Sequence, residues 1–195
     1  VIYEEKSVIP RKESGCLALE TDAFLQRQIE KEDEKLPGVI EGEGQVLMQC
    51  RETQVATAHD KFMFDSYGSV SACESHAIAV MNNVATNWDN EFADEIQFYI
   101  SEQFVEQNNL AWPTSSNNAV TVLSTFRSWA NGGGFSGPYD LGQIWTDRDF
   151  AGGTIGVAYL SAVCSGSRYH ALQDFSNNAA LLRVLTSHEI GHNFS

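Results

Sequence analysis

The amino-acid sequence predicts one domain of the α/β or α+β class. The chain has 195 residues, which is enough for a single well-packed domain and leaves little room for a second. Its apolar fraction of 43%, with eleven Phe, six Tyr and four Trp, is typical of a globular protein. Segments with the pattern of strands alternate along the chain with segments that have the pattern of amphipathic helices, and this alternation indicates the class.

The first third of the chain is predicted to be largely irregular. Residues 1–14 are charged and are expected to be a tail or the end of a removed pro-segment. Cys16–Asp22 has the pattern of a short buried strand. An insertion is predicted over about residues 24–72, because a charged run and several turn signals fall there. Within it, QVLMQC (45–50) and KFMFDSY (61–67) are predicted to be strands.

A long amphipathic helix is predicted over Glu74–Phe92, with Ser75 as its N-cap. Apolar residues recur there at intervals of three to four and predict one buried face, made of Ile78, Met81, Val84 or Ala85, and Trp88. A half-exposed strand follows over Glu95–Val105, because apolar and polar residues alternate in this segment.

The second half of the chain is predicted to contain two helices and three strands. A helix is expected over Ala119–Ala130, and the glycine-rich segment after it predicts a turn. The last helix is expected to start after a cap at Ser176 or Asn177. The predicted strands are Leu141–Thr146, Gly153–Leu160 and Tyr169–Phe175.

Charge and hydropathy exclude two kinds of partner. The chain carries 26 acidic and 12 basic residues, a formal net charge of −14. Such a chain is repelled by phosphate backbones, so nucleic acid is not an expected partner. No apolar run reaches the roughly 18 residues that a membrane-spanning helix needs, so no span is predicted. The sequence does not indicate an oligomeric state.

The cysteines favour an exported protein. Cys16, Cys50, Cys73 and Cys164 are widely spaced and form no CxxC pair, which suits disulfides. The alternative is that they are buried free thiols. Four cysteines allow three pairings, and the sequence does not choose among them. The N-terminus has no apolar signal region, and a start at Val suggests a processed chain.

The segment His188–His192, with the sequence HEIGH, carries the strongest chemical signal. Residues four apart on a helix project from the same face, so His188 and His192 can bind one zinc ion through their imidazole nitrogens. Glu189 lies about 100° further round the helix and can reach a metal-bound water as a general base. Two histidines at this spacing can also be ordinary core residues or a solvated pair.

Two longer segments around this motif extend the pattern. DFAGGTIGVAYLSAVC and YHALQDFSNNAALLRVLTSHEIGHNFS, within Asp149–Ser195, resemble the adamalysin/reprolysin branch of the metzincins, to which ADAM and snake-venom metalloproteases belong. Weaker likeness extends back to LALETD as the first strand. The resemblance implies a twisted five-stranded mixed sheet with an antiparallel edge strand, and an active-site helix beneath a cleft.

The same resemblance implies roles for individual residues. His188 and His192 would be zinc ligands, and Glu189 would be the base that activates water. The strand at residues 153–158 would form the upper rim of the cleft, where a substrate pairs as an added strand. The residues of this predicted substrate strand are Gly153, Thr154, Ile155, Gly156, Val157 and Ala158.

The sequence departs from the family motif HExxHxxGxxH in two ways. The third histidine would lie three residues beyond Ser195, and Ser195 stands where the family has Gly. Residues 15–195 are therefore expected to be the N-terminal part of a catalytic domain, without the C-terminal subdomain and its Met-turn. Cys164 matches a cysteine of the family whose disulfide partner lies past the active-site helix, so that partner would also lie beyond Ser195. His170 is a weaker candidate for a substitute ligand, and His59 and His76 are expected at the surface or at helix caps.

The predicted function is an exported, extracellular zinc endopeptidase that acts on a protein or peptide substrate. With two ligands alone, the 195-residue chain is expected to bind zinc weakly and to be inactive by itself. One alternative is another zincin whose third ligand is a downstream Glu. The other is a secreted, catalytically inactive binding module that keeps the fold.

Overall fold

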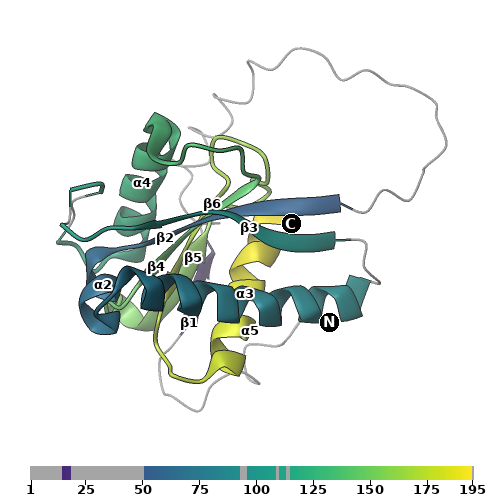
Figure 1. Ribbon diagram of the computed structural model, residues 1–195, viewed down its shortest axis with the longest axis horizontal. Coiled ribbons are helices and arrows are strands. Elements are labelled where there is room, and N and C mark those ends of the chain that lie inside the picture. Colours follow the sequence, from purple (N-terminus) through teal and green to yellow (C-terminus); the bar gives the residue numbers. More distant parts are fainter. Residues whose placement is uncertain (1–14, 19–50, 93–95, 109, 113–114, 195) are drawn as a thin grey trace.

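The chain folds into three layers, a twisted sheet between helices on its two faces (Figure 1). The computed structural model describes residues 15–18, 51–92, 96–108, 110–112 and 115–194. The strands are β1 (Gly15–Ala18), β2 (Arg51–His59), β3 (Ile96–Val105), β4 (Leu141–Thr146), β5 (Thr154–Ala158) and β6 (Tyr169–Gln173). The helices are α2 (Lys61–Tyr67), α3 (Val70–Phe92), α4 (Ala119–Trp129) with a π-helical extension (Ala130–Gly134), a 3₁₀ turn (Ala151–Gly153) and α5 (Ala179–Phe194).

The sheet confirms the predicted mixed α/β architecture. The strand order is β1-β5-β6-β4-β2-β3. Strands β6, β4, β2 and β3 run parallel, and β5 is antiparallel to β6, so these five strands are the predicted five-stranded mixed sheet. The described residues add one more strand, because β1 pairs in parallel with β5 on its outer side. In this structure β5 is therefore not at the edge.

The predicted insertion over residues 24–72 is wrong for its C-terminal part. Residues 51–59 form β2, which lies between β4 and β3, and its residues from Val55 to His59 are fully buried. Residues 61–67 form the helix α2 and not a strand. The Asp60 carboxylate accepts a hydrogen bond from the Met63 amide at 3.0 Å and caps this helix, and Gly68, at φ 73°, ends it. QVLMQC lies outside the described residues.

The predicted helices exist, and their starts need correction. Helix α3 begins at Val70, and the Ser69 hydroxyl, not Ser75, accepts a hydrogen bond from the backbone amide of the first turn, at Ala72. Ile78, predicted to be buried, is 45% exposed. Helix α5 begins at Ala179, and the Asn178 side chain caps it in place of Ser176 or Asn177. The predicted first strand, 16–22, is described only as β1.

Two apolar layers position α5 against the sheet. On one face, α4 contributes Val122, Leu123 and Phe126, which pack with Ala56 of β2. On the other face, α3 and α5 pack over Val55, since neighbouring residues of a strand point to opposite faces. Helix α5 contacts α3, β5 and β6, and buries Leu182, Leu185 and Ile190. Truncation of Leu185 to Ala is expected to cost about 2–5 kcal/mol of stability.

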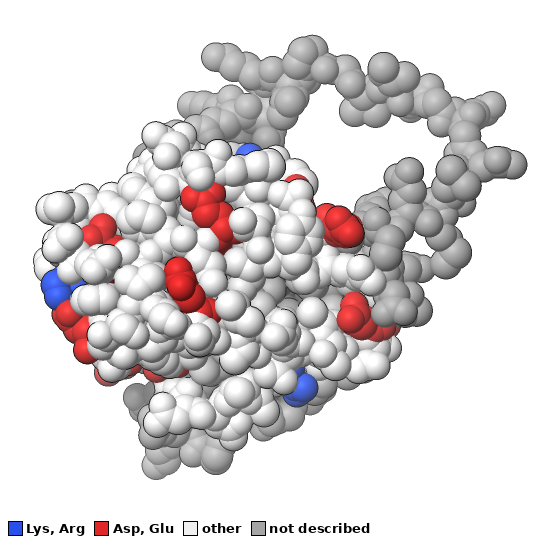
Figure 2. Space-filling model, in the orientation of Figure 1, with Lys and Arg blue, Asp and Glu red and all other residues white. Residues whose placement is uncertain are grey.

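The surface agrees with the acidic composition. Figure 2 shows acidic side chains scattered over the visible face, with few basic side chains between them. Within the described ranges, no helix is long and apolar enough to cross a membrane.

Candidate metal centre

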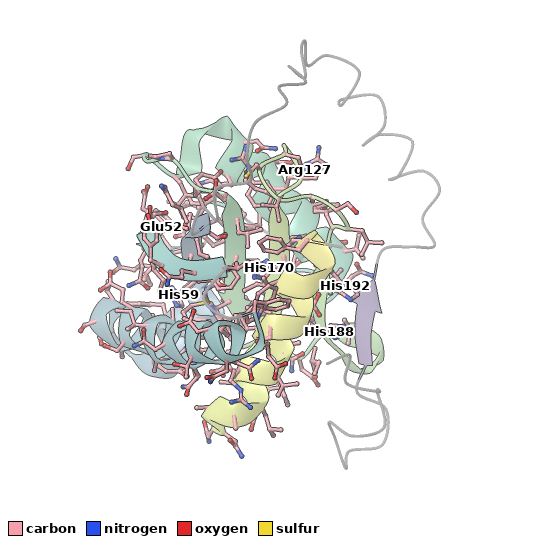
Figure 3. The ribbon with its side chains drawn as sticks, turned by 90° about the vertical axis from the view of Figure 1, so that its right-hand side faces the viewer. Glu52, His59, Arg127, His170, His188 and His192 are labelled. Carbon is pink, nitrogen blue, oxygen red and sulfur yellow. The ribbon has the colours of Figure 1, made fainter. Side chains whose placement is uncertain are left out.

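Two imidazoles converge on the exposed side of α5. His188 and His192 are one turn apart, and their Nε2 atoms lie 2.9 Å from each other. The ring centroids are 4.5 Å apart with the planes nearly perpendicular, at 88°. His188 is exposed and His192 is half-buried, and both project from the same side of the helix (Figure 3). The structure therefore brings together two nitrogen donors as the sequence predicted.

Glu189 lies between the helix and β5. It is fully buried, although it directly follows the exposed His188. Its carboxylate rests against Gly156: a Cβ atom at position 156 would overlap the Glu189 carboxylate and come within 2.7 Å of Leu185 Cδ1. A glycine at this position thus lets the backbone of β5 approach the helix closely enough to cover the carboxylate.

The donor chemistry of this site fits zinc. Two imidazole nitrogens that face each other across 2.9 Å can share one ion with ligand distances of about 2.0–2.1 Å. Calcium and magnesium prefer oxygen ligands, which this pair does not supply. Among the residues that the structure describes, no group of three or more His, Cys, Asp or Glu side chains is placed to hold a metal. A third protein ligand is therefore not found in these ranges.

The other histidines have positions that the sequence did not reveal. His170, the candidate substitute ligand, is fully buried on β6 and hydrogen-bonds to Asn193 and Gln143, away from the imidazole pair. The prediction that His59 and His76 lie at the surface or at caps is also wrong. His59 is fully buried at the end of β2, and the His76 side chain is 9% exposed against Trp145.

The predicted substrate strand occupies the position next to α5. Thr154–Ala158 forms β5, and its last four residues are buried. Gly153 precedes the strand in the 3₁₀ turn, with φ 74°, so the predicted range 153–160 is too long. The outer edge of β5 pairs with β1, with Cys16 opposite Gly156. Any further strand that pairs with this edge must displace β1.

The cysteines for which the structure describes a side chain are free thiols. Cys73 is buried in α3, and burial raises the pKa of its thiol. Cys164 is an exposed residue, and partial desolvation of its thiol, followed by the hydrogen bond that Sγ donates to Asp140 Oδ1 at 3.3 Å, raises the pKa of that thiol. These two residues agree with the free-thiol alternative. The side chains of Cys16 and Cys50 lie outside the described residues.

Buried histidines make the stability of the fold depend on pH. Burial, with a smaller contribution from His76, lowers the pKa of His59 to about 4, and burial lowers that of His170 to about 4. The pKa of each histidine is lower in the folded protein than in the unfolded chain. The fold therefore has its full stability above pH 6.5, and it loses stability as the pH falls from 6.5 toward 4. At about 1.36 kcal/mol per pH unit, each group contributes about 3 kcal/mol. The free energy of unfolding, measured by urea titration, is expected to fall over this range.

The variant His59→Leu provides the check on this pH dependence. It removes one of the two contributions, so its unfolding free energy should fall less steeply between pH 6.5 and 4.5 than that of the unchanged protein. Equal slopes would contradict the assignment of the pH dependence to His59. Asp174, the carboxylate whose charge opposes the lowering of the His59 pKa, is present in both proteins.

Comparison with known proteins places this chain in one family. Residues 49–195 match metallo-peptidase family M12, of the reprolysin type. The chain belongs to this family, whose members are in general zinc-dependent peptidases. The matched segment begins after β1, so β2 is the first strand within it and the predicted first strand, LALETD, lies outside it.

Individual relatives match over shorter segments. The chain is 39% identical over 80 residues to disintegrin and metalloproteinase domain-containing protein 19 of Mus musculus, covering 40% of this chain and 9% of that protein. It is 43% identical over 56 residues to zinc metalloproteinase barnettlysin-1 of Bothrops barnetti, covering 28% of each. The chain thus aligns with less than a third of the length of these relatives. A solved "chaperone-substrate complex" shares the fold, with a TM-score of 0.54 and 18% identity over 73% of this chain and 23% of that chain.

Proposed function

We propose that this chain carries the catalytic centre of a zinc-dependent endopeptidase. His188 and His192 would hold the zinc ion, and Glu189 would be the general base. The observation that carries the proposal is the pair of Nε2 atoms, 2.9 Å apart, beside a fully buried carboxylate in a chain of the M12 family. A satisfied pair of core histidines does not account for His188, which is exposed.

Each residue of the site has a distinct chemical role. Zinc, when bound, polarises the carbonyl of the scissile peptide bond and makes water a stronger acid. Glu189 takes a proton from the attacking water and then gives it to the leaving amine. The backbone of β5, at Gly156, covers this carboxylate.

The substrate is proposed to bind along the outer edge of β5. The residues proposed to bind it, from Gly153 to Ala158, would pair with an extended peptide through main-chain hydrogen bonds. This edge holds β1 in the structure, so binding of a substrate strand requires β1 to leave. The third zinc ligand, and the secretion predicted from the cysteines, remain predictions; the family motif places that ligand three residues past Ser195.

Hydrolysis of an extended fluorogenic peptide tests the proposed function. The full-length protein, with whatever sequence follows Ser195, is expected to cleave the peptide, to lose this activity with 1,10-phenanthroline and to regain it with added zinc. Cleavage that continues after the removal of metal would contradict the proposal. Addition of magnesium in place of zinc is the control, because two imidazoles suit zinc and not magnesium.

Two deletions test the position of the substrate strand in the same assay. Removal of residues 1–18 takes away β1 and is expected to raise kcat/KM at least several-fold, since the β5 edge becomes available. Removal of residues 1–14 leaves β1 in place and is the matched control. Equal activities of the two shortened proteins would contradict the assignment of the β5 edge to substrate binding.

A further inference from the structure

We propose that His170 is a positioning residue for the metal site: through Asn193 it anchors the last turn of α5, from which His192 projects. His170 belongs to β6, in the middle of the sheet, and Asn193 directly follows His192. The inference deepens the proposed function and rests on it for the role of His192. In this proposal a residue of strand β6, His170, holds a residue of helix α5, His192, in place.

The anchor is a buried chain of hydrogen bonds across three strands and the helix. His170 Nδ1 lies 2.8 Å from Asn193 Oδ1, and His170 Nε2 lies 3.3 Å from Gln143 Oε1. The other end of the Gln143 amide lies 3.0 Å from the Thr57 hydroxyl, which can donate or accept. All four side chains are at most 1% exposed. A buried network of this kind is rigid when each member is satisfied.

The direction of these bonds follows from the Asn193 amide. Its Nδ2 donates to the carbonyl oxygens of Tyr159, at 2.8 Å, and Tyr169, at 3.3 Å, so Oδ1 must face His170 and accept. His170 therefore carries its proton on Nδ1. Burial lowers the pKa of His170 to about 4, which keeps the ring neutral, so Nε2 accepts. The Gln143 amide is therefore assigned with its nitrogen toward the ring and its oxygen toward the Thr57 hydroxyl, which donates to it, because the two ends of an amide are assigned from the network.

The anchored turn is the one that carries His192. The amide of Ser161 donates to the His192 carbonyl at 3.0 Å, and the amides of Ala162 and Val163 donate to the Asn193 carbonyl at 2.8 and 3.1 Å. The last carbonyls of a helix have no partner within the helix, so these bonds tie its end to the loop after β5. The His170 side chain adds a bond from the sheet to those that the Asn193 side chain makes with the carbonyl oxygens of Tyr159 and Tyr169. Figure 3 labels His170 at the sheet, to the left of the helix that bears His188 and His192, whose labels lie to the right.

An exchange of His170 for two different amides separates the two bonds of the ring. In His170→Asn the amide nitrogen takes about the position of Nδ1, so the bond to Asn193 is kept and the bond to Gln143 is lost. In His170→Gln the side-chain amide reaches about the position of Nε2, where its oxygen accepts from the Gln143 amide, so the bond to Gln143 is kept and the bond to Asn193 is lost. The two variants are equally polar, which makes them matched. His59→Gln is the control for a buried histidine, because His59 lies at the end of β2, next to His76 and Asp174.

Two measurements on the full-length protein give the test. Hydrogen exchange of the last-turn amides of α5 in the metal-free protein is expected to be faster in His170→Gln than in His170→Asn and His59→Gln. Zinc affinity, from competition with a chelator at pH 7.5, is expected to fall about tenfold or more in His170→Gln only, as loss of an outer support typically does. Equal exchange in the two His170 variants would overturn the anchor.

The outcomes distinguish the anchor from the proposed function. Equal loss of zinc affinity in His170→Gln and His59→Gln would mean that general stability, and not the anchor, sets the affinity, and would overturn the proposal. An unchanged protein that binds no zinc would refute the proposed function, and with it the role of the anchor at a metal site. Faster exchange confined to the last turn in His170→Gln, with weaker zinc binding, is the result that supports both.

Discussion

Glu189→Gln is expected to abolish peptide hydrolysis in the full-length protein and to leave zinc binding unchanged. The amide has the shape of the carboxylate and fits the same fully buried space beside Gly156, but it cannot take a proton from water. Loss of a general base typically costs about 10²–10⁴-fold in rate. The measurements are kcat/KM for a fluorogenic peptide and the zinc content of the purified variant.

The matched control for this change lies on a neighbouring helix. Glu74→Gln makes the same chemical change on α3, outside the imidazole pair and β5, and is expected to keep full activity. Glu189→Ala should behave as Glu189→Gln does. Activity near that of the unchanged protein in either Glu189 variant would remove the proposed base from the mechanism.

Gly156→Ala is expected to lower both activity and stability. The added Cβ would overlap the Glu189 carboxylate and meet Leu185 Cδ1 at 2.7 Å, so β5 and α5 must move apart or the carboxylate must turn away. Overpacking of this kind costs about 1–3 kcal/mol. Activity is expected to fall by more than tenfold, because the general base moves from its position. Thermal unfolding and peptide hydrolysis measure the two effects.

A glycine of α5, Gly191, gives the control for Gly156→Ala. Gly191 has open space where a Cβ would lie, and its φ is ordinary for a helix. Gly191→Ala is therefore expected to keep the fold and to raise its stability by up to about 1 kcal/mol, the difference in helix propensity. If Gly156→Ala were as stable and as active as Gly191→Ala, the close contact between β5 and Glu189 would be refuted.

Most elements of the fold could be predicted because their apolar pattern is strong. Strands β3, β4, β5 and β6 and helices α3, α4 and α5 lie within a few residues of their predicted ranges. Strand β2 was missed because its sequence, RETQVATAH, is rich in polar residues and follows a charged stretch. In the folded sheet, Asp140 accepts a hydrogen bond from the backbone amide of Gln54, and the Thr57 hydroxyl hydrogen-bonds to Gln143. These hydrogen-bond partners are 86 residues apart in the sequence, so a local sequence pattern gives no sign of them.

The site was predictable where its residues are neighbours in sequence. The spacing of His188 and His192 gave their shared face, and the helix brings their Nε2 atoms together. The place of Gly156 against Glu189, and of His170 against Asn193, depends on how β5, β6 and α5 pack. The two buried histidines at β2 and α3 were also missed, because nothing in their local sequence shows that the ends of β2 and β4 surround them.

Zinc content is the most direct test of the proposed centre. The full-length protein, dialysed against trace zinc and analysed by mass spectrometry, is expected to hold one zinc ion per chain at this site. His188→Ala and His192→Ala should each lose that ion, because each removes one of the two converging nitrogens. His59→Ala, which removes a buried histidine outside the site, should keep it. A full equivalent of zinc in His188→Ala would contradict the assignment of α5 as the metal-binding helix.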